Sequence, residues 1–119
     1  MKLLLDNLPA SLSAKREVLT RCLEAFNAVT PVHAVYLFGS HARGDARPDS
    51  DVDLCIVAEG AERQLDTARR YRQALWKVRP HLAFTLVPIA PGRLEEKKAD
   101  GDYFFATVLK EGRLLAAQN

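Results

Sequence analysis

The chain has 119 residues, of which 48% are hydrophobic, so it can build one compact core but is short for two ordinary domains. It contains no apolar segment of the length that crosses a membrane and no pattern of a secretory signal. Its formal net charge of +2 is too small for the global field that draws a protein to nucleic acid. We therefore expect a single soluble, cytoplasmic domain over residues 1–119, with no direct contact to membrane or nucleic acid.

The first half of the chain predicts one helix followed by two strands. Apolar residues recur at helical spacing from Ser11 to Val29, and Pro31 follows. The segment Val32 to Phe38 is β-branched and aromatic, and Asp51 to Val57 has the same character, so each predicts a buried strand. The polar segment between these strands is short for a parallel crossover, which makes them antiparallel neighbours.

The second half predicts two further helices, a strand and a short helical turn. Helical spacing runs from Ala61 to Val78 and again from Asp102 to Lys110, where Gly112 stands at the expected end. Leu82 to Val87 predicts a strand in which Thr85 lies on the opposite face from the larger apolar side chains. A short helix is expected to begin near Pro91.

The cysteines and histidines carry no recognisable motif. Cys22 and Cys55 lie far apart in apolar segments without C-x-x-C spacing, which predicts buried thiols in a reducing compartment. The three histidines show no metal-binding spacing, so no zinc site is expected. Of these, His41 stands in a turn and is expected to have a local structural role.

Two acids at the start of the second strand are the strongest chemical signal. Asp51 and Asp53 are two residues apart, so on a strand both side chains project from the same face. Like charges at this distance repel and raise at least one pKa, whereas a divalent cation removes the penalty. Oxygen ligands suit Mg²⁺, which takes its remaining ligands from water and substrate phosphates. The sequence thus predicts Asp51 and Asp53 as metal ligands and catalytic acids.

A phosphate-binding turn is predicted at the end of the preceding strand. Gly39 lets the backbone turn and approach a ligand, and the hydroxyl of Ser40 can donate to phosphate. Arg43 follows three residues later and can neutralise phosphate charge, and Ser50 is a further candidate beside the acids. The segment is not a Walker A loop, because Asp45 stands where that loop needs lysine.

The joint pattern resembles a known superfamily. Gly-Ser at residues 39–40, ten intervening residues and Asp-x-Asp at residues 51–53 are similar to the signature of the DNA polymerase β-like nucleotidyltransferases. The fuller Gly-Ser-His-Ala-Arg-Gly and Ser-Asp-Val-Asp-Leu segments resemble its minimal members, the MNT proteins. The resemblance implies an α/β (α+β) fold with a small mixed sheet flanked by helices. It also implies Mg²⁺-dependent transfer of a nucleoside monophosphate from a triphosphate such as ATP to a hydroxyl. Minimal members typically pair with an all-helical HEPN protein, often as antitoxin to a ribonuclease toxin.

One position departs from the pattern that the resemblance implies. Family members with the full set have a third carboxylate in a context like Val-Asp-Leu-Val-Pro, and here Thr85 stands at the place of that acid. A threonine hydroxyl is not an ionised ligand or base at neutral pH, and loss of a positioned base costs about 10²–10⁴ in rate. A phenol, with a pKa of about 10, needs less help in losing its proton than a sugar alcohol. We therefore expect AMP transfer to a tyrosine of a HEPN partner.

Several alternatives stay open on the sequence alone. The chain could be a nucleotide-binding antitoxin that acts by contact without chemistry, or a transferase for a small molecule such as an aminoglycoside. Other acids could replace the missing carboxylate: Asp45, Asp49, Glu95 and Glu96. The aromatic residues 103–105 either complete the core or contact a helical partner or a second copy of the chain.

Overall fold

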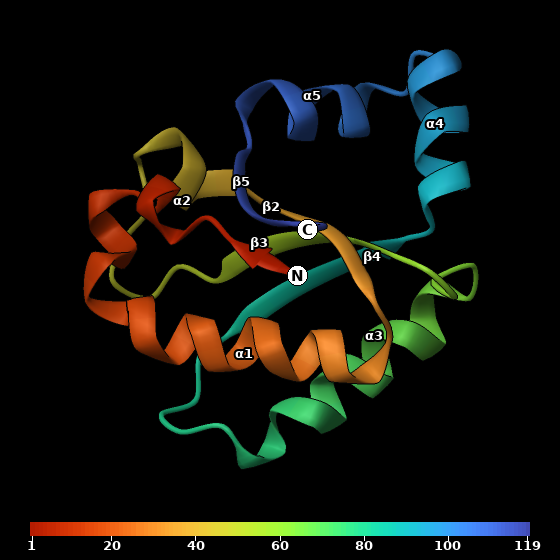
Figure 1. Ribbon diagram of the computed structural model, residues 1–119. Coiled ribbons are helices and arrows are strands. Elements are labelled where there is room, and N and C mark those ends of the chain that lie inside the picture. The colour runs from red at the N-terminus through yellow and green to blue at the C-terminus, as the bar shows by residue number, and fades with distance from the viewer.

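A mixed five-stranded sheet forms the centre of the computed structural model, which describes residues 1–119 (Figure 1). Its strand order is β1-β5-β2-β3-β4. The pairing of β2 with β3 is antiparallel, as predicted, and that of β3 with β4 is parallel. The strands are β1 (Lys2–Leu3), β2 (Val32–Phe38), β3 (Val52–Ala58), β4 (Phe84–Ile89) and β5 (Arg113–Ala117).

Helices cover both faces of this sheet. Figure 1 shows α1 and α3 below the sheet, α4 and α5 above it, and the short α2 at one end. None of the helices has the length and hydropathy that crossing a bilayer requires. Three 3₁₀ turns add to them, at Leu5–Asn7, Ala10–Lys15 and Leu75–Lys77. The helices are α1 (Arg16–Val29), α2 (Gly39–Arg43), α3 (Gln64–Ala74), α4 (Pro91–Ala99) and α5 (Tyr103–Glu111).

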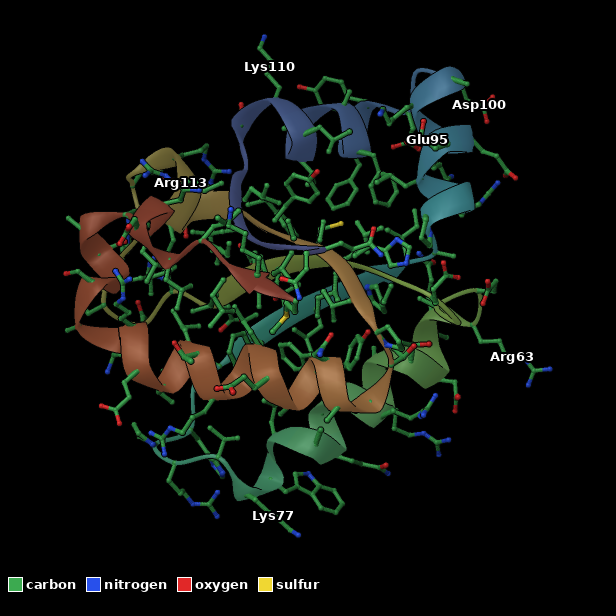
Figure 2. All side chains as sticks on the ribbon, in the orientation of Figure 1. Arg63, Lys77, Glu95, Asp100, Lys110 and Arg113 are labelled. Carbon is green, nitrogen blue, oxygen red and sulfur yellow. The ribbon has the colours of Figure 1, made fainter.

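Alternation along the strands divides the core into two layers. Leu54 and Ile56 belong to a cluster of 20 buried residues that includes side chains of α1 and α3. Cys55 and Val57 face the other way and join a cluster of only 6 buried residues, with side chains of α4 and α5. The side chains of Lys77 and Lys110 point outward on opposite sides of the molecule (Figure 2). At one end of the sheet face that this smaller cluster covers, Thr85 remains exposed.

The boundaries of some predicted elements were wrong. The first helix begins at Arg16 rather than Ser11, because residues 10–15 form a 3₁₀ turn. The strand predicted from Leu82 begins at Phe84, and the helix predicted over residues 61–78 is α3 followed by a 3₁₀ turn. The short β1 and the strand β5 were not predicted.

The prediction of two buried thiols is confirmed. Cys22 and Cys55 are both free and buried in the structure. Burial raises the pKa of the Cys22 thiol to about 11 and that of the Cys55 thiol to about 12. Both sulfurs are therefore protonated and unreactive near neutral pH.

Candidate active site

The two acids lie at the uncovered end of the sheet. Asp51 immediately precedes β3, and Asp53 is its second residue. Asp53 pairs with Phe38 at the end of β2 and with Thr85 near the start of β4. Alternation places Asp53 on the same face as Cys55, under α4 and α5. The two acids therefore lie at the end of this sheet face, next to the apolar residues that α4 and α5 cover.

Thr85 adjoins both acids. Its hydroxyl donates a hydrogen bond to Oδ2 of Asp51 at 3.3 Å, and Thr85 is the register partner of Asp53 on the neighbouring strand. Asp51 and Asp53 therefore both lie beside this exposed residue at the end of the sheet. The position that the resemblance assigns to a third acid adjoins both carboxylates, but it carries an uncharged group.

The surroundings of Asp53 disfavour its charged form. Burial is the largest cause that raises the pKa of this carboxyl, and the negative charge of Asp51 raises it further. The neighbouring side chains of Thr85, His41 and Arg43 lower this pKa in part. The net pKa of Asp53 lies above its ordinary value of 3.8. A bound cation would offset this penalty, because it interacts favourably with the ionised pair.

This raised pKa predicts how stability depends on pH in metal-free protein. The folded state binds the Asp53 proton more tightly than the unfolded state does. The stabilisation of the folded state by this proton is complete below pH 3.8 and is lost as the pH rises through the folded pKa. The variant Asp53→Asn is expected to be at least as stable as wild type at neutral pH and to lose this part of the pH dependence. Thermal unfolding in EDTA across this range is the measurement, and a variant that is less stable at neutral pH would contradict the expectation.

Gly39 is required by its position beside Asp53. It follows β2 directly and has a φ of +74°, a conformation that residues with a Cβ rarely adopt. A Cβ added at Gly39 would lie 1.9 Å from Oδ2 of Asp53. The backbone of the turn and the carboxylate are therefore in direct contact, which holds the turn and the acid in a fixed relation.

An open cleft of about 470 Å³ joins the turn to the acid. One wall comes from the predicted site, and the opposite wall comes from α5. The structure thus brings together four predicted site residues: Gly39, Ser40, Arg43 and Asp53. The remaining lining residues are Phe38, Phe104, Thr107, Val108 and Glu111.

Two of the predicted phosphate contacts differ in their surroundings. Arg43 is half-exposed at the cleft, and its Nε donates to Oδ2 of Asp45 at 3.4 Å. Ser50 lies outside this cleft and lines a separate hollow, and its hydroxyl accepts a hydrogen bond from the backbone of Arg47 at 2.8 Å. A role of Ser50 in binding phosphate stays a prediction that this arrangement does not support.

His41 has the structural role that was expected of it. It is buried, its Nδ1 lies 2.9 Å from the hydroxyl of Ser11, and its Nε2 lies 3.4 Å from the carbonyl oxygen of Ser50. These contacts connect α2 with the 3₁₀ turn Ala10–Lys15 before α1 and with the loop before β3. His41 therefore fixes the position of the turn relative to the acids.

None of the alternative acids replaces the missing carboxylate at the cleft. Asp45 contacts Arg43, and Asp49 lines a separate hollow with Ser50. Glu95 and Glu96 form ion pairs within α4 at 3.3 and 2.7 Å, with Lys98 and Arg93 respectively. Three cleft residues of α5 were not predicted as part of the site, although their spacing places them on one helical face: Phe104, Thr107 and Glu111.

The donor set fits a divalent cation that arrives with a nucleotide. No three side chains of the histidine, cysteine, aspartate and glutamate types are grouped to hold a metal ion. Two carboxylates are nevertheless sufficient for a hard cation that keeps several waters and binds substrate phosphates. The raised pKa of Asp53 is consistent with a pair that needs such a cation to be fully ionised.

Comparisons with known proteins identify the family of this domain. A structure described as that of a proposed nucleotidyltransferase from Sulfolobus solfataricus superimposes with a TM-score of 0.52 and 22% sequence identity, covering 67% of this chain and 70% of that chain. At this identity the likeness shows the fold alone. No curated protein gives a significant match. The sequence profile of the nucleotidyltransferase domain matches residues 15–110, which include the turn and both acids. Since this match spans most of the chain, the protein belongs to the nucleotidyltransferase domain family.

Proposed function

We propose that this chain transfers AMP from ATP to a tyrosine hydroxyl of an all-helical HEPN partner, in a reaction that depends on Mg²⁺. The observation that carries the proposal is the meeting of Gly39, Ser40 and Asp53 in one open cleft, with Asp51 hydrogen-bonded to Thr85, the register partner of Asp53. Such a site can hold a triphosphate and its cation together. Its resemblance to the MNT proteins supports an antitoxin role for the transfer.

Each residue has a distinct part in this proposal. Asp51 and Asp53 would hold Mg²⁺, which when bound neutralises charge on the phosphate oxygens. Gly39 allows close approach of the phosphates, and Ser40 and Arg43 donate hydrogen bonds to them. The tyrosine oxygen forms a bond to the α-phosphorus while the bond to the β-phosphate oxygen breaks. Pyrophosphate leaves, and the phenolic proton passes to water.

The uncharged group at Thr85 favours a phenolic acceptor. Its hydroxyl donates to Asp51, and Thr85 neighbours Asp53 in the strand register, so it can orient an acid but cannot take up a proton as a base. A phenol with a pKa of about 10 ionises far more readily than an alcohol. Tyrosine is therefore the protein hydroxyl that best suits a site with two carboxylates.

The direct test is an incubation with Mg-ATP and the HEPN partner. The partner to be tested is a small helical protein that carries an Arg-x₄-His ribonuclease motif and a nearby tyrosine, sought among the products of adjacent genes. Intact-mass spectrometry should find one or more added adenylyl groups on the partner, and peptide mapping should place them on tyrosine. An unmodified partner that still forms a complex with the chain would argue against transfer.

Thr85→Asp is expected to increase the transfer rate. Because Thr85 pairs with Asp53 and its hydroxyl lies 3.3 Å from Asp51, aspartate at this position would add a third carboxylate to the pair. A positioned base contributes about 10²–10⁴ in rate, so we expect at least about tenfold faster transfer, with the larger gain for alcohol acceptors. Initial rates with saturating Mg-ATP are the measurement.

Thr85→Asn is the matched control for that prediction, since it has similar size and no charge. It should show no gain in rate. In EDTA, Thr85→Asp should melt at a lower temperature than Thr85→Asn, because three carboxylates repel one another. Equal rates and equal melting temperatures for the two variants would show that the third position does not join the acid pair.

A second candidate function is an antitoxin that binds its partner by contact alone. The presence of Thr85 favours this contact-only function, because the site then lacks an ionised third group. The double variant Asp51→Asn/Asp53→Asn separates the two functions. Transfer predicts that this variant no longer protects cells from the partner, whereas contact alone predicts that protection is retained.

A further inference from the structure

The wall of the cleft opposite the acids is one face of α5. Phe104, Thr107 and Glu111 all line the cleft, and their spacing of three and seven residues places them on one side of the helix. This wall is polar at one end and aromatic at the other. Neither a triphosphate nor its cation needs such a surface.

Phe104 presents a fixed aromatic ring to the cleft. Its centroid lies 5.4 Å from that of Phe38 and 5.0 Å from that of Phe105, with interplanar angles of 88° and 82°. The side chain nevertheless remains 41% exposed. Two edge contacts therefore hold the ring while leaving part of it free, so a planar ligand could pack against it with little loss of side-chain entropy.

Glu111 presents a carboxylate that has no partner within the protein. It forms no ion pair and no side-chain hydrogen bond, although Arg43 lines the same cleft. It also does not group with Asp51 and Asp53 as a metal ligand. An ionised carboxylate only accepts hydrogen bonds, and it repels phosphate. The part of a nucleotide that suits it is therefore a hydroxyl or amino donor of the nucleoside.

Glu111 and Phe104 lie at opposite ends of the cleft-facing side of α5. Near Glu111, Arg113 pairs with Leu37 and the position of Gly112 adjoins the Leu37 carbonyl, whereas the Phe104 ring packs on Phe38. Phe104 is seven residues earlier, or about 10 Å along the helix axis at ~1.5 Å per residue. In a nucleotide the ribose adjoins the phosphates and the base lies beyond it.

We infer that α5 is the nucleoside-binding wall of this site. The carboxylate of Glu111 accepts hydrogen bonds from the ribose hydroxyls, and the base packs against the exposed part of Phe104. Carboxylates recognise ribose hydroxyls in other nucleotide folds by the same chemistry. The inference rests on the proposed function, because it requires that a nucleoside triphosphate binds in the cleft.

The test is a binding measurement without acceptor, so it does not depend on transfer. Calorimetry with Mg²⁺ compares ATP, 2′,3′-dideoxy-ATP and inorganic tripolyphosphate on wild type, Glu111→Gln and Phe104→Ala. Glu111→Gln should weaken ATP about tenfold and leave dideoxy-ATP unchanged. Phe104→Ala should weaken both nucleotides about tenfold and leave tripolyphosphate unchanged.

Two neighbouring residues provide matched controls. Tyr103→Ala removes an aromatic ring that is 84% exposed and outside the cleft, and Glu95→Gln neutralises an exposed acid of α4. Both should bind all three ligands as wild type does. Thermal unfolding of each variant checks that α5 remains folded, because Phe104 also contacts Phe38 and Phe105.

The outcomes separate this inference from the proposed function. If wild type binds tripolyphosphate as tightly as ATP, or if Glu111→Gln weakens ATP and dideoxy-ATP equally, the nucleoside wall is refuted while AMP transfer remains tenable. If folded Phe104→Ala binds both nucleotides normally, the base does not pack there. Failure of wild type to bind any of the three ligands would overturn the inference and the proposed function together.

Discussion

Replacing both Asp51 and Asp53 by asparagine is expected to lower AMP transfer by about a thousandfold or more. Both acids adjoin Thr85, Asp51 through a hydrogen bond from its hydroxyl and Asp53 as its register partner. Asparagine keeps their size but removes the negative charge that would hold Mg²⁺ beside the triphosphate, and with it the neutralisation of charge on the transferring phosphoryl group. The measurement is transfer of label from ATP labelled at the α-phosphate to the partner protein.

A double variant at two distant acids controls for the loss of charge. Asp6 and Asp66 form exposed ion pairs with Arg16 and Arg69 at 2.9 and 2.7 Å, respectively. Neither acid lines the cleft. Asp6→Asn/Asp66→Asn changes the net charge by the same amount and should transfer AMP at the wild-type rate. Activity of the Asp51→Asn/Asp53→Asn variant within tenfold of wild type would mean that these acids do not carry the reaction.

Gly39→Ala is expected to impair both stability and transfer. A residue with a Cβ at a φ of +74° costs roughly 1–3 kcal/mol. The new methyl group would also lie 1.9 Å from Oδ2 of Asp53, so the turn or the carboxylate must move. A displacement of about 1 Å at a reacting group can cost about a hundredfold in rate. Thermal unfolding and transfer rates of the same preparation measure the two effects.

Gly101→Ala separates the clash from the backbone strain. Gly101 has a similar φ of +71°, but no atom lies within 4 Å of its added Cβ, and it is not part of the cleft. This variant should lose some stability and retain transfer. If Gly39→Ala and Gly101→Ala behave alike in transfer, contact between the turn and Asp53 is not important for the reaction.

The sequence predicted the part of the fold that carries the acids. Strands β2 and β3 have continuous apolar patterns that end at polar turns, so their existence and antiparallel pairing followed from local signals. The period of two also placed Asp51 and Asp53 on one face and Thr85 opposite Phe84. These features depend on residues that are close together in the sequence.

Features that depend on distant contacts were not predictable in this way. The strand β5 has five residues, and pairing with β1 and β2 at the other end of the chain determines its place in the sheet. Likewise, Phe104 and Glu111 follow an ordinary helical pattern, and only the packing of α5 over Phe38 brings them to the cleft. Ser50 is the opposite case, because it was predicted as a phosphate contact from the sequence. In the structure its hydroxyl accepts a hydrogen bond from the backbone of Arg47 in a local turn.

Calorimetric titration of the wild-type chain with ATP, in Mg²⁺ and again in EDTA, tests most directly whether the acid pair and the turn form one site for a cation and a triphosphate. We predict saturable binding at one site per chain in Mg²⁺, and affinity at least about tenfold lower in EDTA, because the cation links both carboxylates to the phosphates. Absence of heat in Mg²⁺, or equal affinity under the two conditions, would contradict this account of the site.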